Sequence, residues 1–205
     1  MLHIGTCLWD SNSKSQPFSR CYTEEWVEKL YRGFKRNLSH PFKFACFTDR
    51  PRAFSEPIFQ KRLVTPVPSY GCFIEPFRLD VPMILVGLDT IIVGNIDHMA
   101  NYCLTETELA LPRDPYQPDR SINGVALIPA GHKAIFDDWR NENDMEWLRR
   151  FPNAWIDDLF PGEVLSIKFH DVRRKGLQGA SIIYAHGRPK QNELTGHDWV
   201  RDHWR

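Results

Sequence analysis

Long apolar runs are missing from this 205-residue chain: no uninterrupted stretch reaches the roughly 18 apolar residues of a membrane-spanning helix. The first residues, MLHIGTCLWD, also lack the basic region and the long apolar region of a signal peptide. We therefore expect no transmembrane segment and no export signal, and the cytoplasm is the expected compartment.

Net charge and paired cysteine motifs are missing as well. The 26 basic and 26 acidic residues cancel, which gives no electrostatic reason for a large nucleic-acid or anionic-membrane footprint, and we expect no nucleic-acid partner. The five cysteines are odd in number, and no two of them form a Cys-x-x-Cys pair. A zinc knuckle and a disulfide framework are therefore poorly supported.

What the chain does have is an alternation of strand and helix patterns. Segments 2–9 and 42–49 read as strands, and segment 23–38 between them carries Trp26, Leu30 and Phe34 at helical spacing. Thr23 is the expected N-cap of that helix. Because parallel strands are joined by crossover helices, the pattern predicts an α/β fold with a mostly parallel central sheet and helices on both faces.

The remaining segments extend this pattern over one domain, residues 1–205. Further strands are expected at 82–88, 90–97, 124–129, 164–169 and 181–187, and one or two helices at 132–151. Segment 50–71 has four prolines in 22 residues and reads as a loop with short extended pieces. The aromatic and charged tail, 196–205, fits either a packed cap or a mobile end.

Asp89 is the most conspicuous charge, because it lies inside the apolar run ILVGLDTIIVGNID at 84–97. It follows a strand buried on both faces, and ligands of parallel sheets bind beyond the carboxyl ends of strands. The pattern indicates a group that holds a metal ion or a sugar hydroxyl. The alternative is a turn in which the Asp–Thr pair bonds its own backbone.

A second candidate segment is YAHGRPK, which follows the last expected strand. The imidazole of His186 suits Mn²⁺, and the backbone of Gly187 and the ammonium of Lys190 suit a phosphate. The alternative is a solvated basic turn. Taken with Asp89, the segment predicts a divalent ion that bridges a diphosphate and whose shell is completed by diphosphate oxygens.

In their order along the chain, these segments resemble the GT-A-fold (Rossmann-like) glycosyltransferases, specifically the compact bacterial and phage type that uses nucleotide-diphospho-sugars. The likeness is carried by CYTEEWVEKLYRGFKRNLSHPFKFACFTDRP, MILVGLDTIIVGNID with the Asp-x-Asp position, INGVALIPAG, NDMEWLRRFP, LSIKFH and IIYAHGRPKQNE. Three positions depart from the family pattern. Gly87 replaces the first acid of Asp-x-Asp, Met145 replaces a Gln, and Gln191 replaces the second Pro of the closing His-Gly-x-Pro-Lys-Pro.

The resemblance implies a role for each matching residue. Asp89 and His186 would ligate Mn²⁺ or Mg²⁺, and Lys190 with the Gly187 backbone would hold the diphosphate. The other residues implied in donor or acceptor binding are Trp9 and Tyr22 (base), Asp49 (the Thr-Asp pair), Arg78 (phosphate or sugar), and Asn123 with Gly124 (sugar or acceptor). Single aromatic residues such as Trp9 and Tyr22 are equally well explained as packing residues.

The catalytic carboxylate has two candidates. Asp144 matches the family position, whereas Asp157 and Asp158 are an unaligned pair that also fits a solvated turn. An inverting transfer needs a carboxylate that deprotonates the acceptor hydroxyl, and a retaining transfer needs a nucleophile or assistance from the leaving phosphate. The closing motif favours retention.

The resemblance thus implies a metal-dependent glycosyltransferase that uses a UDP-sugar and an acceptor that is a glycan, a lipid-linked sugar or a small molecule. Residues 1–98 would bind the nucleotide, and residues 99–205 would carry the acceptor and catalytic groups. The alternative is a catalytically weakened relative that binds sugar nucleotides or glycans. A nucleotidyltransferase is disfavoured, because WDSNSKSQPFSR has no glycine-rich loop after the first strand.

Overall fold

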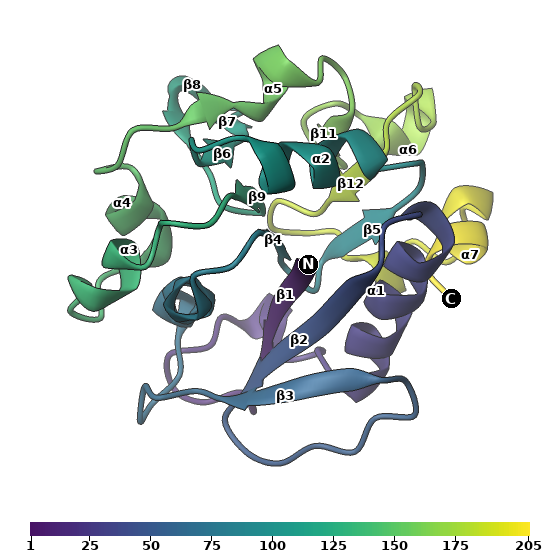
Figure 1. The fold of residues 1–205 in the computed structure, drawn as a ribbon. Coiled ribbons are helices and arrows are strands. Elements are labelled where there is room, and N and C mark those ends of the chain that lie inside the picture. Colours follow the sequence, from purple (N-terminus) through teal and green to yellow (C-terminus); the bar gives the residue numbers. More distant parts are fainter.

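A seven-stranded sheet forms the centre of the molecule in the computed structural model, which describes residues 1–205 (Figure 1). Its strand order is β10-β6-β9-β4-β1-β2-β3. The strands are β1 (Leu2–Leu8), β2 (Phe42–Thr48), β3 (Ile58–Arg62), β4 (Met83–Val86), β6 (Ala110–Leu111), β9 (Val125–Ile128) and β10 (Ala154–Trp155). Only β9 runs antiparallel to its neighbours, β4 and β6, which confirms the predicted mostly parallel sheet.

Two smaller sheets complete the strands. One has the order β11-β12-β5, with β11 at Val164–Ser166, β12 at Ile182–Tyr184 and β5 at Thr90–Ile92. The other is a hairpin of β7 (Arg113–Asp114) and β8 (Gln117–Ser121). The strand expected at 90–97 is therefore shorter and leaves the central sheet, because β5 pairs antiparallel with β12. Asp89 lies at the point where the chain changes sheets.

The structure has helices in both segments where they were predicted, 23–38 and 132–151, and four more, at 97–105, 156–159, 172–175 and 198–203, that were not predicted. The helices are α1 (Glu24–Asn37), α2 (Asp97–Thr105), α3 (Ala134–Asp137), α4 (Asp144–Leu148), α5 (Ile156–Leu159), α6 (Val172–Lys175) and α7 (Asp198–His203), with 3₁₀ turns η1 (Pro17–Ser19), η2 (Tyr70–Leu79) and η3 (Gln191–Glu193). Thr23 precedes α1, but its side chain makes no capping hydrogen bond. The proline-rich segment contains a true strand, β3, and leads directly into η2. None of the helices has the length and hydropathy of a membrane span.

Helices cover both faces of the central sheet, because alternate strand residues point to opposite sides. Ile4 and Ile84 belong to a cluster of 38 buried apolar residues that includes the inner faces of α1 and α2. Met83 and Leu85, on the other face, belong to a cluster of 12 that contains residues of η2, α3 and α4. The predicted two-sided covering is therefore confirmed.

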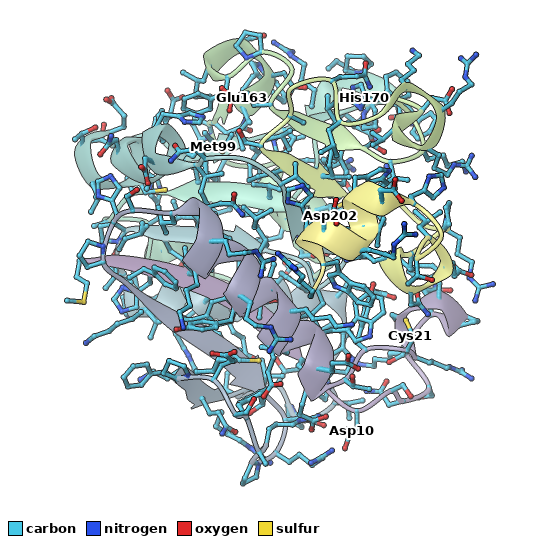
Figure 2. All side chains as sticks on the ribbon, turned by 90° about the vertical axis from the view of Figure 1, so that its right-hand side faces the viewer. Asp10, Cys21, Met99, Glu163, His170 and Asp202 are labelled. Atoms are coloured by element: carbon cyan, nitrogen blue, oxygen red, sulfur yellow. The ribbon has the colours of Figure 1, made fainter.

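The C-terminal tail is packed against α1, as Figure 2 shows for the helix that carries Asp202. The guanidinium of Arg36 donates to the carbonyl of His203 (2.5 Å), and Trp26 packs edge-on against Trp204 at 4.7 Å between ring centroids. The tail is thus a cap on α1.

Candidate functional site

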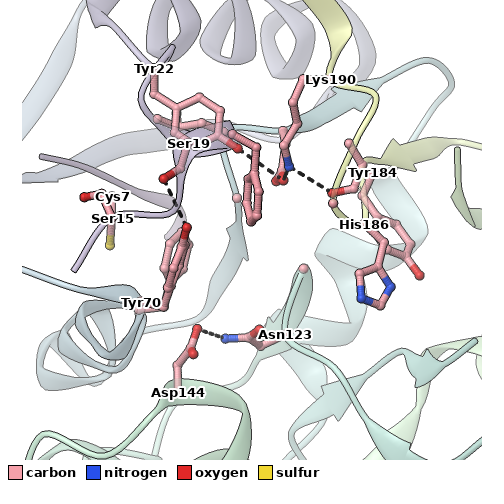
Figure 3. Close-up of a pocket in the computed structure, with 18 of the residues that line it drawn as sticks. Cys7, Ser15, Ser19, Tyr22, Tyr70, Asn123, Asp144, Tyr184, His186 and Lys190 are labelled. Carbon is pink, nitrogen blue, oxygen red and sulfur yellow. Dashed lines mark hydrogen bonds and ion pairs between the residues drawn. The ribbon is translucent and has the colours of Figure 1, made fainter. Parts of the chain in front are cut away.

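A cavity of about 210 Å³ lies at the carboxyl ends of β1 and β4 (Figure 3). This is the edge at which open parallel sheets bind ligands. The cavity is lined by most residues that the sequence singled out: Trp9, Tyr22, Asp89, Asn123, Gly124, Asp144, His186, Gly187 and Lys190. Segments from both ends of the chain therefore meet in one place.

Two predicted donor-binding residues do not line this cavity. Asp49 accepts a hydrogen bond from the guanidinium of Arg52 at 2.6 Å. Arg78 lies over the ring of Phe47 at 5.3 Å and 3.9 Å from a carboxylate oxygen of Glu75. Both side chains are engaged in contacts that tie loops to the sheet.

The pair Asp157 and Asp158 also lies outside the residues that line the cavity. Asp157 accepts from the backbone N–H of Arg113 at 2.8 Å, and Asp158 pairs with the Arg113 guanidinium at 2.6 Å. The Asp158 side chain is 62% exposed. These contacts join α5 to β7.

The charge of Asp89 is balanced by a lysine from the far end of the chain. The ammonium of Lys190 donates to Oδ2 of Asp89 and, at 3.3 Å, to the carbonyl of Ala185. Its ring neighbour is Phe18, at 4.9 Å from Nζ to the ring centroid. Lys190 is 2% exposed and Asp89 22%, so the pair meets the requirement that a buried charge has a partner.

Tyr22 completes this arrangement from the start of α1. Its hydroxyl donates to Oδ2 of Asp89 at 3.3 Å. Burial, reinforced by the Asp89 carboxylate, raises the pKa of Tyr22, so the phenol remains a protonated donor. Oδ2 is thus held by two donors, whereas Oδ1 accepts no hydrogen bond from the protein.

The presence of glycine at position 87, two residues before Asp89, has a steric explanation. A Cβ at position 87 would lie 2.6 Å from Oδ1 of Asp89, which is closer than a Cβ carbon approaches an atom to which it is not bonded. The backbone N–H of Gly87 also donates to the carbonyl of Gly124 at 3.2 Å, which holds this segment against the start of β9. The present direction of the Asp89 carboxylate therefore requires glycine at 87.

Gln191, one of the three departures from the family pattern, follows Lys190 but does not itself line the cavity. Its side chain is fully buried, and its amide donates to the carbonyl of Leu88 at 3.1 Å. A proline at this position has no such donor. Gln191 therefore fastens the closing segment to the end of β4.

An aromatic wall was also missed. Tyr70 and Phe73, from η2, pack edge-on against Trp9 at 6.1 and 6.4 Å between centroids, and the Tyr70 hydroxyl donates to Ser19 at 3.0 Å. Phe18 lines the same cavity. The local sequence did not predict a binding role for Tyr70 and Phe73, because the prolines before and after them are typical of a loop.

The opposite wall carries a second acid, Asp144, at the start of α4. It is 5% exposed and accepts a hydrogen bond from the amide of Asn123. Burial raises the pKa of Asp144 to about 6. Asn143 caps this helix by accepting from the backbone N–H of Met145 at 3.1 Å, which fixes the direction of Asp144. Met145 brings a thioether to the cavity where the family has an amide.

The groups present fit a divalent ion only with help from a ligand. His186 lines the cavity, and its Nδ1 is buried without a hydrogen-bond partner. Asp89 has its free Oδ1, and no cluster of three or more ligating side chains exists. Two protein donors fall short of the six oxygen or nitrogen ligands typical of Mg²⁺ or Mn²⁺, so ligand oxygens must complete the shell.

Comparisons with known proteins give the fold a name. The sequence matches no protein-family model and no curated protein. The structure has the fold of the GT-A glycosyltransferases. It is similar to GlyE of Streptococcus pneumoniae TIGR4 (TM-score 0.61, 13% identity, 98% of this chain and 62% of that one). It is similar also to an active-site variant of LgtC (TM-score 0.52, 9% identity, 97% and 93%) and to bifunctional WbbM (0.54, 9%, 98% and 50%). The chain spans about three fifths of GlyE.

Proposed function

We propose that this chain, which has the GT-A glycosyltransferase fold, transfers a sugar from a nucleotide-diphospho-sugar, with a UDP-sugar as donor. The observation that carries the proposal is the Asp89–Lys190 pair in an aromatic-walled cavity at the carboxyl ends of parallel strands. Such an edge suits a nucleotide, and the solved structures of similar fold are glycosyltransferases.

The donor would lie along the wall that contains the ion pair. Trp9 and Tyr22 offer aromatic surface to the base. Gly187 has a backbone φ of +76°, a conformation that lets its N–H approach a phosphate closely. Lys190 offers the only ammonium among the residues that line the cavity, and it can pair with a phosphate oxygen.

A divalent ion would supply the charge that the side chains lack. Asp89 already cancels the charge of Lys190, so an incoming diphosphate meets no net positive charge from this pair. We propose Asp89 Oδ1 and His186 as the protein ligands of Mn²⁺ or Mg²⁺, which when bound acts as a Lewis acid toward the leaving diphosphate.

The acceptor would bind on the side of Asp144. We propose that this carboxylate, held by the Asn123 amide, accepts a hydrogen bond from the acceptor hydroxyl and orients it toward the donor sugar. Asp157 and Asp158 remain the alternative carboxylates. We favour retention of configuration, which the anomeric proton coupling of the product tests.

The test is a nucleotide panel read by melting temperature. We expect UDP with Mn²⁺ to raise the melting temperature, as a ligand at about 100 times its dissociation constant adds about 2.7 kcal/mol to the free energy of unfolding. The Asp89→Ala variant is expected to lose this response. The matched control is Asp138→Ala. Asp138 is an exposed acid that lies outside the cavity and whose side chain has no hydrogen-bond or ion-pair partner. A chain that responds to none of UDP, GDP and CMP with Mn²⁺ contradicts the proposal.

One observation favours a second candidate, a weakened relative that binds without transferring. Gly87 removes an acid from the motif, and only two protein ligands remain for an ion. The two candidates differ in donor hydrolysis: an active transferase slowly releases UDP from its donor even without acceptor. Binding of UDP-sugars without any release of UDP across the panel would favour the weakened relative.

A further inference from the structure

Two large aromatic side chains stand exposed beside the cavity. Tyr116 is 54% exposed and Phe169 48%. Their rings meet edge-on with centroids 5.5 Å apart, and the Tyr116 ring lies 5.6 Å from the ring of His186. Because His186 lines the cavity, the Tyr116 ring lies at the border of the cavity and the Phe169 ring lies next to it.

Both rings are held by tight turns from different sheets. Tyr116 lies in the turn of the β7–β8 hairpin, where its backbone N–H donates to the Asp114 carboxylate at 2.9 Å. Phe169 follows β11, and its N–H donates to the Ser166 hydroxyl at 3.4 Å. The fold thus brings two apolar rings together in water, where they contribute little to the core. Two exposed rings that contact each other at the border of a cavity are a candidate binding surface.

We propose that Tyr116 and Phe169 form a platform for a sugar ring of the acceptor, which makes the acceptor a glycan. The inference rests on the proposed function. A pyranose ring has one face of C–H groups, which pack on the electron-rich faces of aromatic rings, and a rim of hydroxyls. The Tyr116 hydroxyl makes no hydrogen bond within the protein and is free to bind such a rim. The position beside His186 is adjacent to the proposed donor.

The surroundings favour a sugar over a lipid chain. The chain neighbours Gln117, after Tyr116, and Lys168, before Phe169, are exposed and polar, so polar groups border the two rings. A lipid surface needs a wider apolar area, whereas a single sugar ring is matched by two aromatic rings with polar groups at their border.

The experiment is saturation-transfer NMR with three methyl glycosides as probes, those of β-galactose, β-glucose and N-acetyl-β-glucosamine, in the presence of UDP and Mn²⁺. We expect at least one glycoside to receive saturation mainly on the protons of one ring face. The double variant Tyr116→Ala/Phe169→Ala should weaken its binding about tenfold, and Tyr116→Phe should retain most of it. Phe59→Ala removes an aromatic ring that is 56% exposed on edge strand β3 and serves as control.

The outcomes separate the platform from the proposed function, because the UDP response is measured on the same samples. Glycoside binding that is lost in the double variant but kept in Phe59→Ala supports the platform. If no glycoside binds, or if binding survives the double substitution while UDP still raises the melting temperature, the platform is overturned alone. Absence of a UDP response in the unmodified chain overturns the proposed function, and the acceptor assignment with it.

Discussion

The ammonium of Lys190 and the carboxylate of Asp89 lie 101 residues apart in sequence and form a buried ion pair inside the cavity. The two partners are unequally buried, since Lys190 is 2% exposed and Asp89 22%. A charge deprived of its partner costs more when water cannot reach it. The two single substitutions therefore have different consequences for stability.

We predict that Asp89→Ala lowers the free energy of unfolding by about 3 kcal/mol, because it leaves the Lys190 ammonium buried without a carboxylate. Lys190→Met should lower the free energy of unfolding by less, because the Asp89 carboxylate is partly exposed and water can hydrate it. Urea denaturation of both variants and of the double variant measures this. Losses that simply add in the double variant would show that the pair is not coupled.

Replacing Gly87 by alanine should destabilise the protein by about 1–3 kcal/mol, because the Asp89 carboxylate must turn away from the new Cβ and thereby from its buried Lys190 partner. Gly87→Asp should destabilise the protein at least as much as Gly87→Ala. It should not strengthen Mn²⁺ binding, although it restores the acid of the family motif. The control is Gly196→Ala, where a Cβ meets no atom within 4 Å. Equal melting temperatures for the two alanine variants would contradict the steric argument.

Asp144 should make stability depend on pH. Burial raises its pKa from 3.8 to about 6 in the folded protein, so the folded state holds the proton more tightly than the unfolded chain does. This stabilisation is complete below pH 3.8 and is lost as the pH rises through about 6. We therefore expect unmodified protein to lose stability relative to Asp144→Asn over that range. Urea denaturation of the unmodified protein and of Asp144→Asn at several pH values measures the difference in their free energies of unfolding. A difference that does not change with pH would contradict the prediction.

Gln191→Ala should cost about 1–3 kcal/mol, because the Leu88 carbonyl loses its buried donor. Gln191→Pro should cost a similar amount. The backbone accepts proline there, since position 191 is the first residue of η3. Thermal unfolding of both variants gives the comparison. A Pro variant as stable as the unmodified protein would show that the amide contact contributes nothing.

The sequence predicted those parts of the fold whose signal is local. β1 and β2 are seven-residue runs that are mostly buried, and α1 carries its apolar residues at helical spacing over 14 residues. The strands β6, β7 and β10 are only two residues long, which is too short to show an alternating pattern in the sequence. The pairing of β5 with β12 joins segments about 90 residues apart, so no local pattern predicts it. An apolar run indicates a buried strand but does not say which sheet it joins, so the change of sheet at Asp89 needed the structure.

The candidate site was predictable where motif order decides position. Asp89, His186 and Lys190 were expected to meet, and all three line the cavity. Asp49 and Arg78 were expected at the site but do not line the cavity. The position of a residue in a motif does not determine the direction of its side chain, and these two side chains contact Arg52 and the Arg62 carbonyl instead. The aromatic wall from η2 arises from long-range packing, which no local pattern encodes.

The pairing of β12 with β5 also sets the order in which the protein can become functional during synthesis. All seven strands of the central sheet have left the ribosome once residue 155 has emerged, whereas β12 and Lys190 emerge later. Until they emerge, the Asp89 carboxylate faces water without its ammonium. The central sheet can thus form before the chain can bind a ligand, so ligand binding reports only on chains that include β12 and Lys190.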